Sequence, residues 1–599
     1  MVSGTAASFD VGNSQDNQVL PFQGKFADSM AAQEPGQPSL ANLSEDVILY
    51  LMDFIQDVSP RSVRNLAMVC SYLHAKARYI QHRHVAVDFS KPDPADSQST
   101  KYLQFLSRSG LLPAVRSLQM RYYEYERSPG AGLVLLKEFL PSMTGLHELE
   151  WIGVKMPNLI FNILKKHPRI RLRARLASYN AHDASLPFLI ASLCGNLNLV
   201  ALDILGTYIA AKDCLEITQP LKKLLLSCPN LRDLSLQISQ SSGCVMHSVP
   251  HEYCGLGFTN GERLPPLKSL RIKRYPWGSS PEESQGARWQ IPFSEGYPGQ
   301  GREIDYWVNT FDWSKLRRLH SNSTDIAEKL MPKLTALKEI DIDEWGSRKP
   351  VPMAIFFENV PSMLELIKIP SLNSVGTSPL LRHGTHLRTL EIHQLERYNR
   401  NWDEGAMKGL DLVKLRDGLP CLEELAIDVS RNEGDWPHDV LDILASFPRL
   451  RSLELWFELG LSNRKNPPPV PYLNFAAASW IFQQLRERSR LQPAALQHLH
   501  VHSGAPPPLG GGLYSYDAHW PEQNSTSFVC RVSERDVDAA RGMFDVECPK
   551  LDRKQNELLA RIARGVEEQS SPEMNQTAFK VALNGPLEME EWKRGHRHW

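Results

Sequence analysis

The sequence has no long apolar run, hardly any net charge and no closely paired cysteines. No stretch of its 599 residues approaches the ~18 apolar residues that a membrane span requires. Its 67 basic and 68 acidic side chains almost cancel, which argues against a dedicated nucleic-acid binder. Its nine cysteines are scattered, and this suits a reducing compartment better than a disulfide framework. These absences predict a protein of the cytoplasm, the nucleus or both, with no membrane and no nucleic acid among its partners.

Residues 1–38 lack the features of a secretory signal, since no basic segment precedes an apolar core. They are rich in Gly, Ser, Gln, Asp and Ala and contain few large apolar side chains. Such a segment cannot bury enough surface to offset the entropy lost on ordering. We therefore expect a disordered tail over 1–38.

Sequence motifs of nucleotide-binding and hydrolytic enzymes are also missing. The chain contains no G-x-x-x-x-G-K-[ST], no strand-linked G-x-G-x-x-G, no G-x-S-x-G and no H-E-x-x-H. We therefore expect a protein that is not an enzyme and that carries no cofactor.

What the sequence does contain is a short phrase of the form L-x-x-L-x-L, with aliphatic substitutions, repeated twelve times at spacings mostly between 21 and 36 residues. Alternate Leu and Ile residues would point inwards along a short strand, and the rest of each unit would return as a helix or an irregular arc. Each unit would bury its apolar face only against its neighbours. The clear copies lie at 231–236, 267–272, 337–342, 387–392, 422–427, 450–455 and 496–501, and weaker ones at 115–120, 146–151, 199–204, 316–321 and 364–369.

This phrase is similar to that of leucine-rich repeats, over residues 100–505. The resemblance implies an α/β fold, an irregular solenoid in which a curved parallel sheet carries helices or arcs on its outer side. The asparagine or cysteine that follows the strand in that family is missing here, so we expect irregular units without an asparagine ladder.

Two stretches rich in Pro and Gly interrupt or end the array. The first, 275–301, predicts a loop insertion, and the second, 503–524, predicts a linker. Residues 525–599 follow as an α/β cap on the array or as a small appendage. Within them we expect a strand followed by a helix over about 527–544, a helix over about 556–569 and a further strand near the end.

Residues 39–90 carry a helical pattern instead. Apolar residues recur at helical spacing behind Ser44, which can cap the first turn. A second helix begins near Pro60, a residue that suits a first helical turn, and a third covers about 72–80. Period-two alternation over 85–89 predicts a strand at the end of the segment.

The helical segment resembles the F-box motif through Leu43, the acidic helix Glu45–Phe54 and the later Leu66, Val69, Cys70 and Leu73. Ser44 stands in place of the family's proline, and Leu73 in place of its aromatic residue. With the repeats behind it, the chain resembles fungal-type F-box/leucine-rich-repeat substrate receptors. The resemblance implies that the helices dock on a Skp-type adaptor of a cullin–RING ubiquitin ligase while the repeats capture a protein substrate. The implied adaptor-facing residues are Leu43, Val47, Leu51, Leu66, Val69, Cys70 and Leu73.

An alternative is that these helices only cap the solenoid, since repeat arrays need a polar-faced terminal cap. The chain would then be an interaction scaffold that works independently of ubiquitination.

The strand phrases also place charged residues on the face opposite the leucines, which is the inner face of a solenoid. Early units contribute basic residues there and later units mostly acidic ones, an arrangement that would orient a partner of opposite charge. Ordinary mixed surface charge is the alternative. Glu339 and Asp428 belong to the acidic set, and Trp456 is the expected aromatic anchor. The expected substrate-binding residues are Arg171, Arg173, Arg271, Lys273, Asp341, Asp343, Glu391, Glu424, Glu454 and Trp456.

Two groups of residues have the composition of a metal site. Cys244, His247, His251 and Cys254 are ligands that zinc accepts, but four of them within eleven residues require a very tight loop, so we favour coincidence and expect no metal there. The second group, His498, His500 and His502, shares one face of a strand. Because no carboxylate lies close in the sequence to complete a site, we expect these histidines to face solvent on the last repeat strand, open to a pH-sensitive contact.

Overall fold

The computed structural model divides the chain into two compact units, the first ending at His82 and the second beginning at Arg83. The expected tail 1–38 and the residues Cys244, His247, His251 and Cys254 lie outside the described residues. The structure describes residues 43–58, 60–89, 98–122, 131–153, 158–177, 185–209, 211–240, 255–273, 275, 303–322, 324–343, 353–396, 402–432, 434–461, 469–489, 496–504, 520, 522–532, 544–566 and 576–586.

In the described part of the first unit lie three helices, close to where the periodicity predicts them: α1 (Glu45–Val58), α2 (Pro60–Ala67) and α3 (Ser71–Gln81). Glu45 and Asp46 lie in the first turn of α1, where the helix dipole favours negative charge. At the start of α3 the Cys70 thiol accepts a hydrogen bond from the Leu73 N–H at 3.5 Å. The helices pack around a small apolar core of Ile48, Met52, Val63, Leu73, Ala77 and Ile80.

In its described residues the second unit is built on a 16-stranded sheet, in which the strands follow one another in sequence order. Strands β1 to β14 are parallel, and β15 and β16 are antiparallel to their neighbours. Their bounds are β1 His84–Asp88, β2 Ser117–Tyr122, β3 Glu148–Gly153, β4 Arg171–Ala177, β5 Leu199–Tyr208, β6 Asp233–Gln240, β7 Ser269–Lys273, β8 Arg318–Ser321, β9 Glu339–Ile342, β10 Leu366–Ile369, β11 Thr389–Ile392, β12 Glu424–Val429, β13 Ser452–Phe457, β14 His498–Ser503, β15 Thr526–Val532 and β16 Phe544–Glu547.

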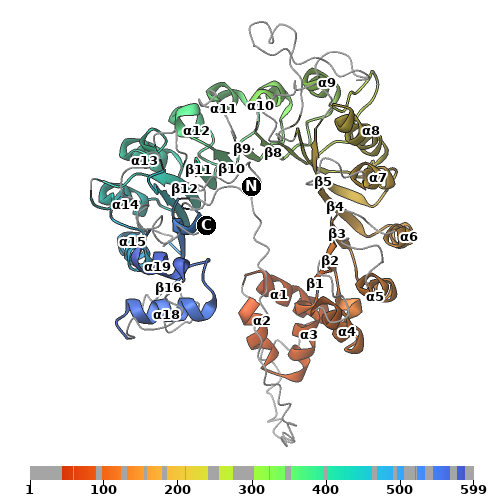
Figure 1. The fold of residues 1–599 in the computed structure, drawn as a ribbon, viewed down its shortest axis with the longest axis horizontal. Helices are drawn as coiled ribbons and strands as arrows, with labels where there is room; N and C mark the ends of the chain where they lie inside the picture. The colour runs from red at the N-terminus through yellow and green to blue at the C-terminus, as the bar shows by residue number, and fades with distance from the viewer. Residues whose placement is uncertain are drawn as a thin grey trace, which may run out of the picture. The chain divides into compact units, whose positions relative to one another are not determined.

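Helices connect the strands and lie on the outer side of the sheet, so that the strands form its inner face (Figure 1). Among the described residues, no helix combines the length and the apolar character needed to cross a bilayer. The helix bounds are α4 Gln98–Arg108, α5 Ala131–Phe139, α6 Asn158–Lys166, α7 Ser185–Ser192, α8 Ala211–Ser227, α9 Glu303–Thr310, α10 Thr324–Leu330, α11 Ala354–Asn359, α12 Thr377–Leu381, α13 Gly409–Gly418, α14 His438–Ala445, α15 Phe475–Ser489, α18 Arg553–Ala563 and α19 Thr577–Asn584, and short 3₁₀ turns lie at Leu112–Ala114, Leu140–Ser142, Met331–Lys333, Leu372–Ser374 and Trp402–Glu404.

Each of the twelve phrases overlaps a strand. The fourth residues of the phrases form one continuous apolar row on the face of the sheet that the helices cover. In-register pairing aligns these side chains from strand to strand, and each is almost fully removed from solvent. From β6 to β14 the row consists of Leu234, Leu270, Leu319, Ile340, Ile367, Leu390, Leu425, Leu453 and Leu499. The expected α/β architecture, a mainly parallel sheet with helices outside it, is confirmed.

One end of this sheet differs from expectation, and at the other the described residues of 525–599 pack on the array as a cap, one of the two alternatives. Strand β1, which the sequence interpretation assigned to the N-terminal segment 39–90, pairs with β2 and so belongs to the second unit. At the other end, residues 526–532 pair antiparallel with β14 and extend the sheet, while α18 and α19 pack against α15. The helix expected near 556–569 is α18, but the last described element is the helix α19 and not the strand expected there.

Candidate functional site

The structure separates the seven implied adaptor-facing residues into core and surface. Leu73 is buried in the core of the first unit, and Leu66 packs half-buried against it. Leu51 is also half-buried. Four residues are exposed and available to a partner: Leu43, Val47, Val69 and Cys70.

Helix α1 is apolar on two faces, one toward the core and one exposed. Val47, Tyr50 and Phe54 follow one another at intervals of three and four residues, so they share a face, while Ile48 and Met52 point to the core. Tyr50 is 73% exposed and Phe54 61%. Soluble proteins seldom leave such a contiguous apolar surface uncovered. We call the exposed row Leu43, Val47, Tyr50 and Phe54 the α1 stripe.

Further exposed apolar residues follow α2. Met68 and Val69 lie in the turn before α3, at 78% and 68% exposure, and Tyr72 lies at its start. Lys76 of α3 pairs with the Glu45 carboxylate of α1 and lies 5.4 Å from the centre of the Tyr72 ring. This contact brings the start of α3 next to the start of the α1 stripe.

On the inner face of the sheet, the expected separation into a basic and an acidic end is not present. Arg173 lies 2.5 Å from Glu148, and Arg175 lies 3.4 Å from Glu150 and 3.3 Å from Asp203. The prediction was wrong because it left out the carboxylates that neighbouring strands place beside these arginines. Most of the later residues are paired too, in the pairs Lys273–Asp343, His320–Asp341 and Lys368–Glu391, and Glu424 accepts a hydrogen bond from Thr389.

Positive charge instead gathers in a hollow of about 670 Å³ at the amino-terminal ends of strands β4 to β9. Of its lining residues only Asp233 and Glu339 are acidic. Arg173 and Arg318 each approach Asp233 at 3.5 Å. We call this surface the basic hollow, and its basic residues are Arg169, Arg171, Arg173, Arg232, Lys268, Arg317, Arg318 and Lys338. Within the described parts of the chain, no carboxylate lies within 4 Å of Arg169, Arg171, Arg232, Lys268 or Arg317.

Of the basic residues that line the hollow, only Arg171 and Arg173 were predicted from the sequence. The signal was the second position of the phrase, which is basic in four consecutive strands as Arg232, Lys268, Arg317 and Lys338. The backbone N–H of Lys268 donates to the Arg232 carbonyl at 2.7 Å. In the same way Arg317 donates to Lys268 and Lys338 to Arg317, both at 2.8 Å. Pairing therefore stacks these positions one beside the next. Arg271, by contrast, lies half-exposed on the inner face, outside the hollow.

Trp456 is a buried residue and not the exposed anchor that was expected. It is only 8% exposed and stacks between the His393 ring at 3.8 Å and the His502 ring at 5.1 Å. His393 is held in turn by Asp428, whose carboxylate lies 2.6 Å from Nδ1. Burial raises the pKa of Asp428, with the His393 charge opposing this. Asp428 and Trp456 therefore make their contacts within the sheet and are not exposed to a partner.

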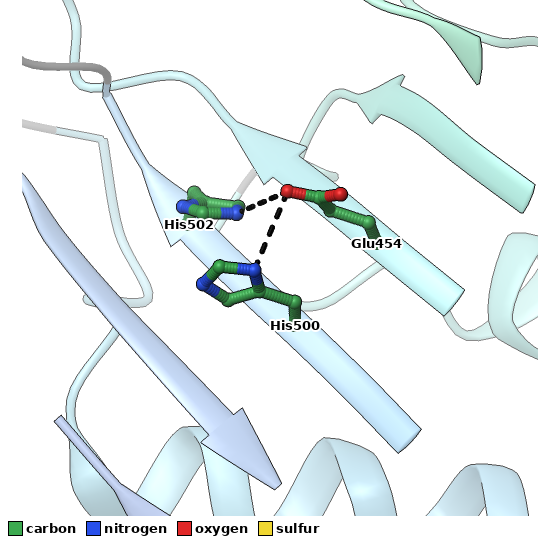
Figure 2. A group of neighbouring side chains, drawn as sticks. All are labelled: Glu454, His500 and His502. Carbon is green, nitrogen blue, oxygen red and sulfur yellow. Dashed lines mark hydrogen bonds and ion pairs between the residues drawn. The ribbon is translucent and has the colours of Figure 1, made fainter. Parts of the chain in front are cut away.

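The strand histidines do not simply face solvent. Only His498 is exposed, while His500 and His502 are half-buried and meet Glu454 of the neighbouring strand β13. As Figure 2 shows, one carboxylate oxygen of Glu454 lies between the two rings, 3.4 Å from His500 Nδ1 and 2.8 Å from His502 Nε2. The carboxylate that the sequence lacked nearby is thus supplied 48 positions away from His502.

No protein-family model matches this chain, and no curated protein matches it. The exposed surfaces, namely the α1 stripe and the basic hollow, therefore carry the functional inference.

Proposed function

We propose that this protein is the substrate-recognition subunit of a Skp–cullin–F-box ubiquitin ligase. Its N-terminal helices would dock on a Skp-type adaptor, and its strand–helix array, as a degenerate leucine-rich-repeat solenoid, would hold a protein substrate. The α1 stripe is the observation that carries this proposal. An apolar row exposed on a helix whose opposite face already fills the unit's core indicates a surface made for a partner.

The size of the apolar surface suits a stable complex. Seven exposed apolar side chains lie on α1 and at the junction of α2 and α3: Leu43, Val47, Tyr50, Phe54, Met68, Val69 and Tyr72. These side chains are 39–78% exposed, so their burial corresponds to that of about four fully exposed side chains, or about 6–12 kcal/mol at about 1.5–3 kcal/mol each. This gain is of the same size as the cost of association, about 4–15 kcal/mol, so the surface can offset most of that cost.

The basic hollow suits an acidic segment of the substrate. Its guanidinium groups can form paired hydrogen bonds with carboxylates or other oxyanions. Binding would involve no chemistry by this chain. It would act by raising the effective concentration of a substrate lysine near the ligase's charged carrier.

Co-purification of the full chain with a Skp-type adaptor tests the proposal. We expect a stable complex with the wild type and loss of the adaptor from the Val47→Asp plus Val69→Asp variant, because both side chains are exposed and neither supports the core. Leu410→Asp is the matched control, since Leu410 is 80% exposed on α13 of the array.

A wild-type chain that brings down no adaptor would refute the proposal. It would favour the alternative, an interaction scaffold in which the N-terminal helices are a cap. Equal adaptor recovery by the wild type and the double variant would show that neither the α1 stripe at Val47 nor the turn at Val69 is the docking surface.

A further inference from the structure

A cluster of metal-ligating side chains lies on strands β13 and β14, outside both proposed binding surfaces. Sheet pairing places Glu454 directly opposite His500 and Trp456 opposite His502. All three side chains of the cluster leave the same face of the sheet, and their ligand atoms lie within 4.8 Å of one another. Figure 2 shows both rings turned toward a single oxygen of the Glu454 carboxylate.

One of the two separations from Glu454 matches that of a tetrahedral metal site, and the other is shorter. Zinc binds imidazole nitrogen at about 2.0–2.1 Å and carboxylate oxygen at about 2.0–2.2 Å, so two ligands on a tetrahedron lie about 3.3–3.5 Å apart. The observed distances from Glu454 Oε1 are 3.4 Å to His500 Nδ1 and 2.8 Å to His502 Nε2. To admit the ion, the Glu454 or His502 side chain would have to turn enough to widen the second separation.

We propose that Glu454, His500 and His502 bind one Zn²⁺ ion in a three-ligand site whose fourth position is open to water or to a side chain of a partner. Two histidines and one carboxylate, with one open position, are a ligand set that zinc commonly takes. The side chains of His500, His502 and Glu454 remain 36%, 16% and 34% exposed, so an ion can enter from solvent.

His500 Nε2 makes no hydrogen bond within the described structure, so no donor there forces the proton onto Nδ1, the nitrogen that faces Glu454.

Neighbouring aromatic rings hold His502 in place. The ring of Trp456 stacks on His502 with an interplanar angle of 8°, and its other face rests on His393, which Asp428 anchors. Such support orients a ligand before the metal arrives and lowers the cost of ordering it. The site does not depend on the proposed adaptor docking.

Zinc and cobalt binding by the full chain test this proposal. We expect the wild type to bind one more equivalent of Zn²⁺ than the His500→Gln plus His502→Gln variant, in titrations against a chromophoric chelator. Loss of a direct ligand should weaken the site by more than about 100-fold, beyond the range for outer-shell changes. His498→Gln is the matched control, because His498 lies on the same strand face but takes no part in the cluster.

Co²⁺ absorption distinguishes this site from a thiolate site. A nitrogen- and oxygen-ligated ion should give visible bands without the strong near-ultraviolet charge transfer of Co–thiolate bonds. Glu454→Gln provides a second variant of nearly unchanged size, and the metal-free melting temperature reports whether each variant folds. The same stoichiometry in the wild type and both cluster variants would overturn the proposal. So would binding that is lost only in Cys244→Ser plus Cys254→Ser.

Discussion

The buried ring of His383 should make the array lose stability as the pH falls from about 7 to 4. His383 follows helix α12 and has no solvent exposure. Its Nδ1 accepts a hydrogen bond from the Leu364 N–H at 3.3 Å, so the ring proton lies on Nε2 and is donated to the Phe357 carbonyl at 3.2 Å. Burial, followed by the charge of Arg382, lowers the pKa of His383 from 6.5 to about 4.

The sign and size of the effect follow from proton linkage. Between pH 6.5 and 4 the unfolded chain binds a proton at this position and the folded chain does not, so stability falls as the pH falls. At about 1.4 kcal/mol for each pH unit between the two pKa values, the full loss is about 3 kcal/mol, and the step from pH 7 to pH 5 costs about 2 kcal/mol.

Urea unfolding of the wild type and of His383→Gln, each at pH 7 and pH 5, measures this contribution. We expect the stability advantage of the wild type to shrink by about 2 kcal/mol at pH 5, because only the wild type titrates at this position. His386→Gln, three residues away at an exposed site, is the matched control. An advantage that stays constant within about 0.5 kcal/mol between the two pH values would refute the reasoning.

Two further predictions concern the array. Arg232→Glu plus Lys268→Glu should abolish binding of a poly-glutamate peptide to the basic hollow, measured by fluorescence anisotropy. Wild-type binding should weaken as salt rises, because salt screens the attraction. Lys414→Glu on α13 is the control, and equal binding by the wild type and both variants would contradict a role for the hollow. Leu390→Ala should lower the free energy of unfolding by about 2–5 kcal/mol, because it opens a cavity in the fully buried apolar row. Thr389→Ala, on the opposite face of the same strand, should cost less than about 1 kcal/mol, and similar losses for the two variants would contradict the assigned register.

The strands were predictable because their signal is local. In a phrase such as 387–392, the alternation of apolar and polar residues predicts which side chains point toward the helices. Strand pairing aligns Leu390 with the equivalent apolar residues of the neighbouring strands. The three N-terminal helices were predictable for the same reason, since capping and helical spacing act within a few residues. Helix α1 has two apolar faces, and only the packing of the three helices shows which of them fills the core.

The sequence by itself therefore determined the elements, their order and the alternation of the strands. The tertiary structure alone decided which side chains meet, because parallel pairing joins residues between 21 and 49 positions apart in the chain. Pairing places Glu150 beside Arg175, buries Trp456 between two histidines and collects Arg232, Lys268 and Arg317 in the basic hollow. It also brings the Glu454 carboxylate of one repeat next to His500 and His502 of the following repeat, and the three side chains together make the proposed ligand set.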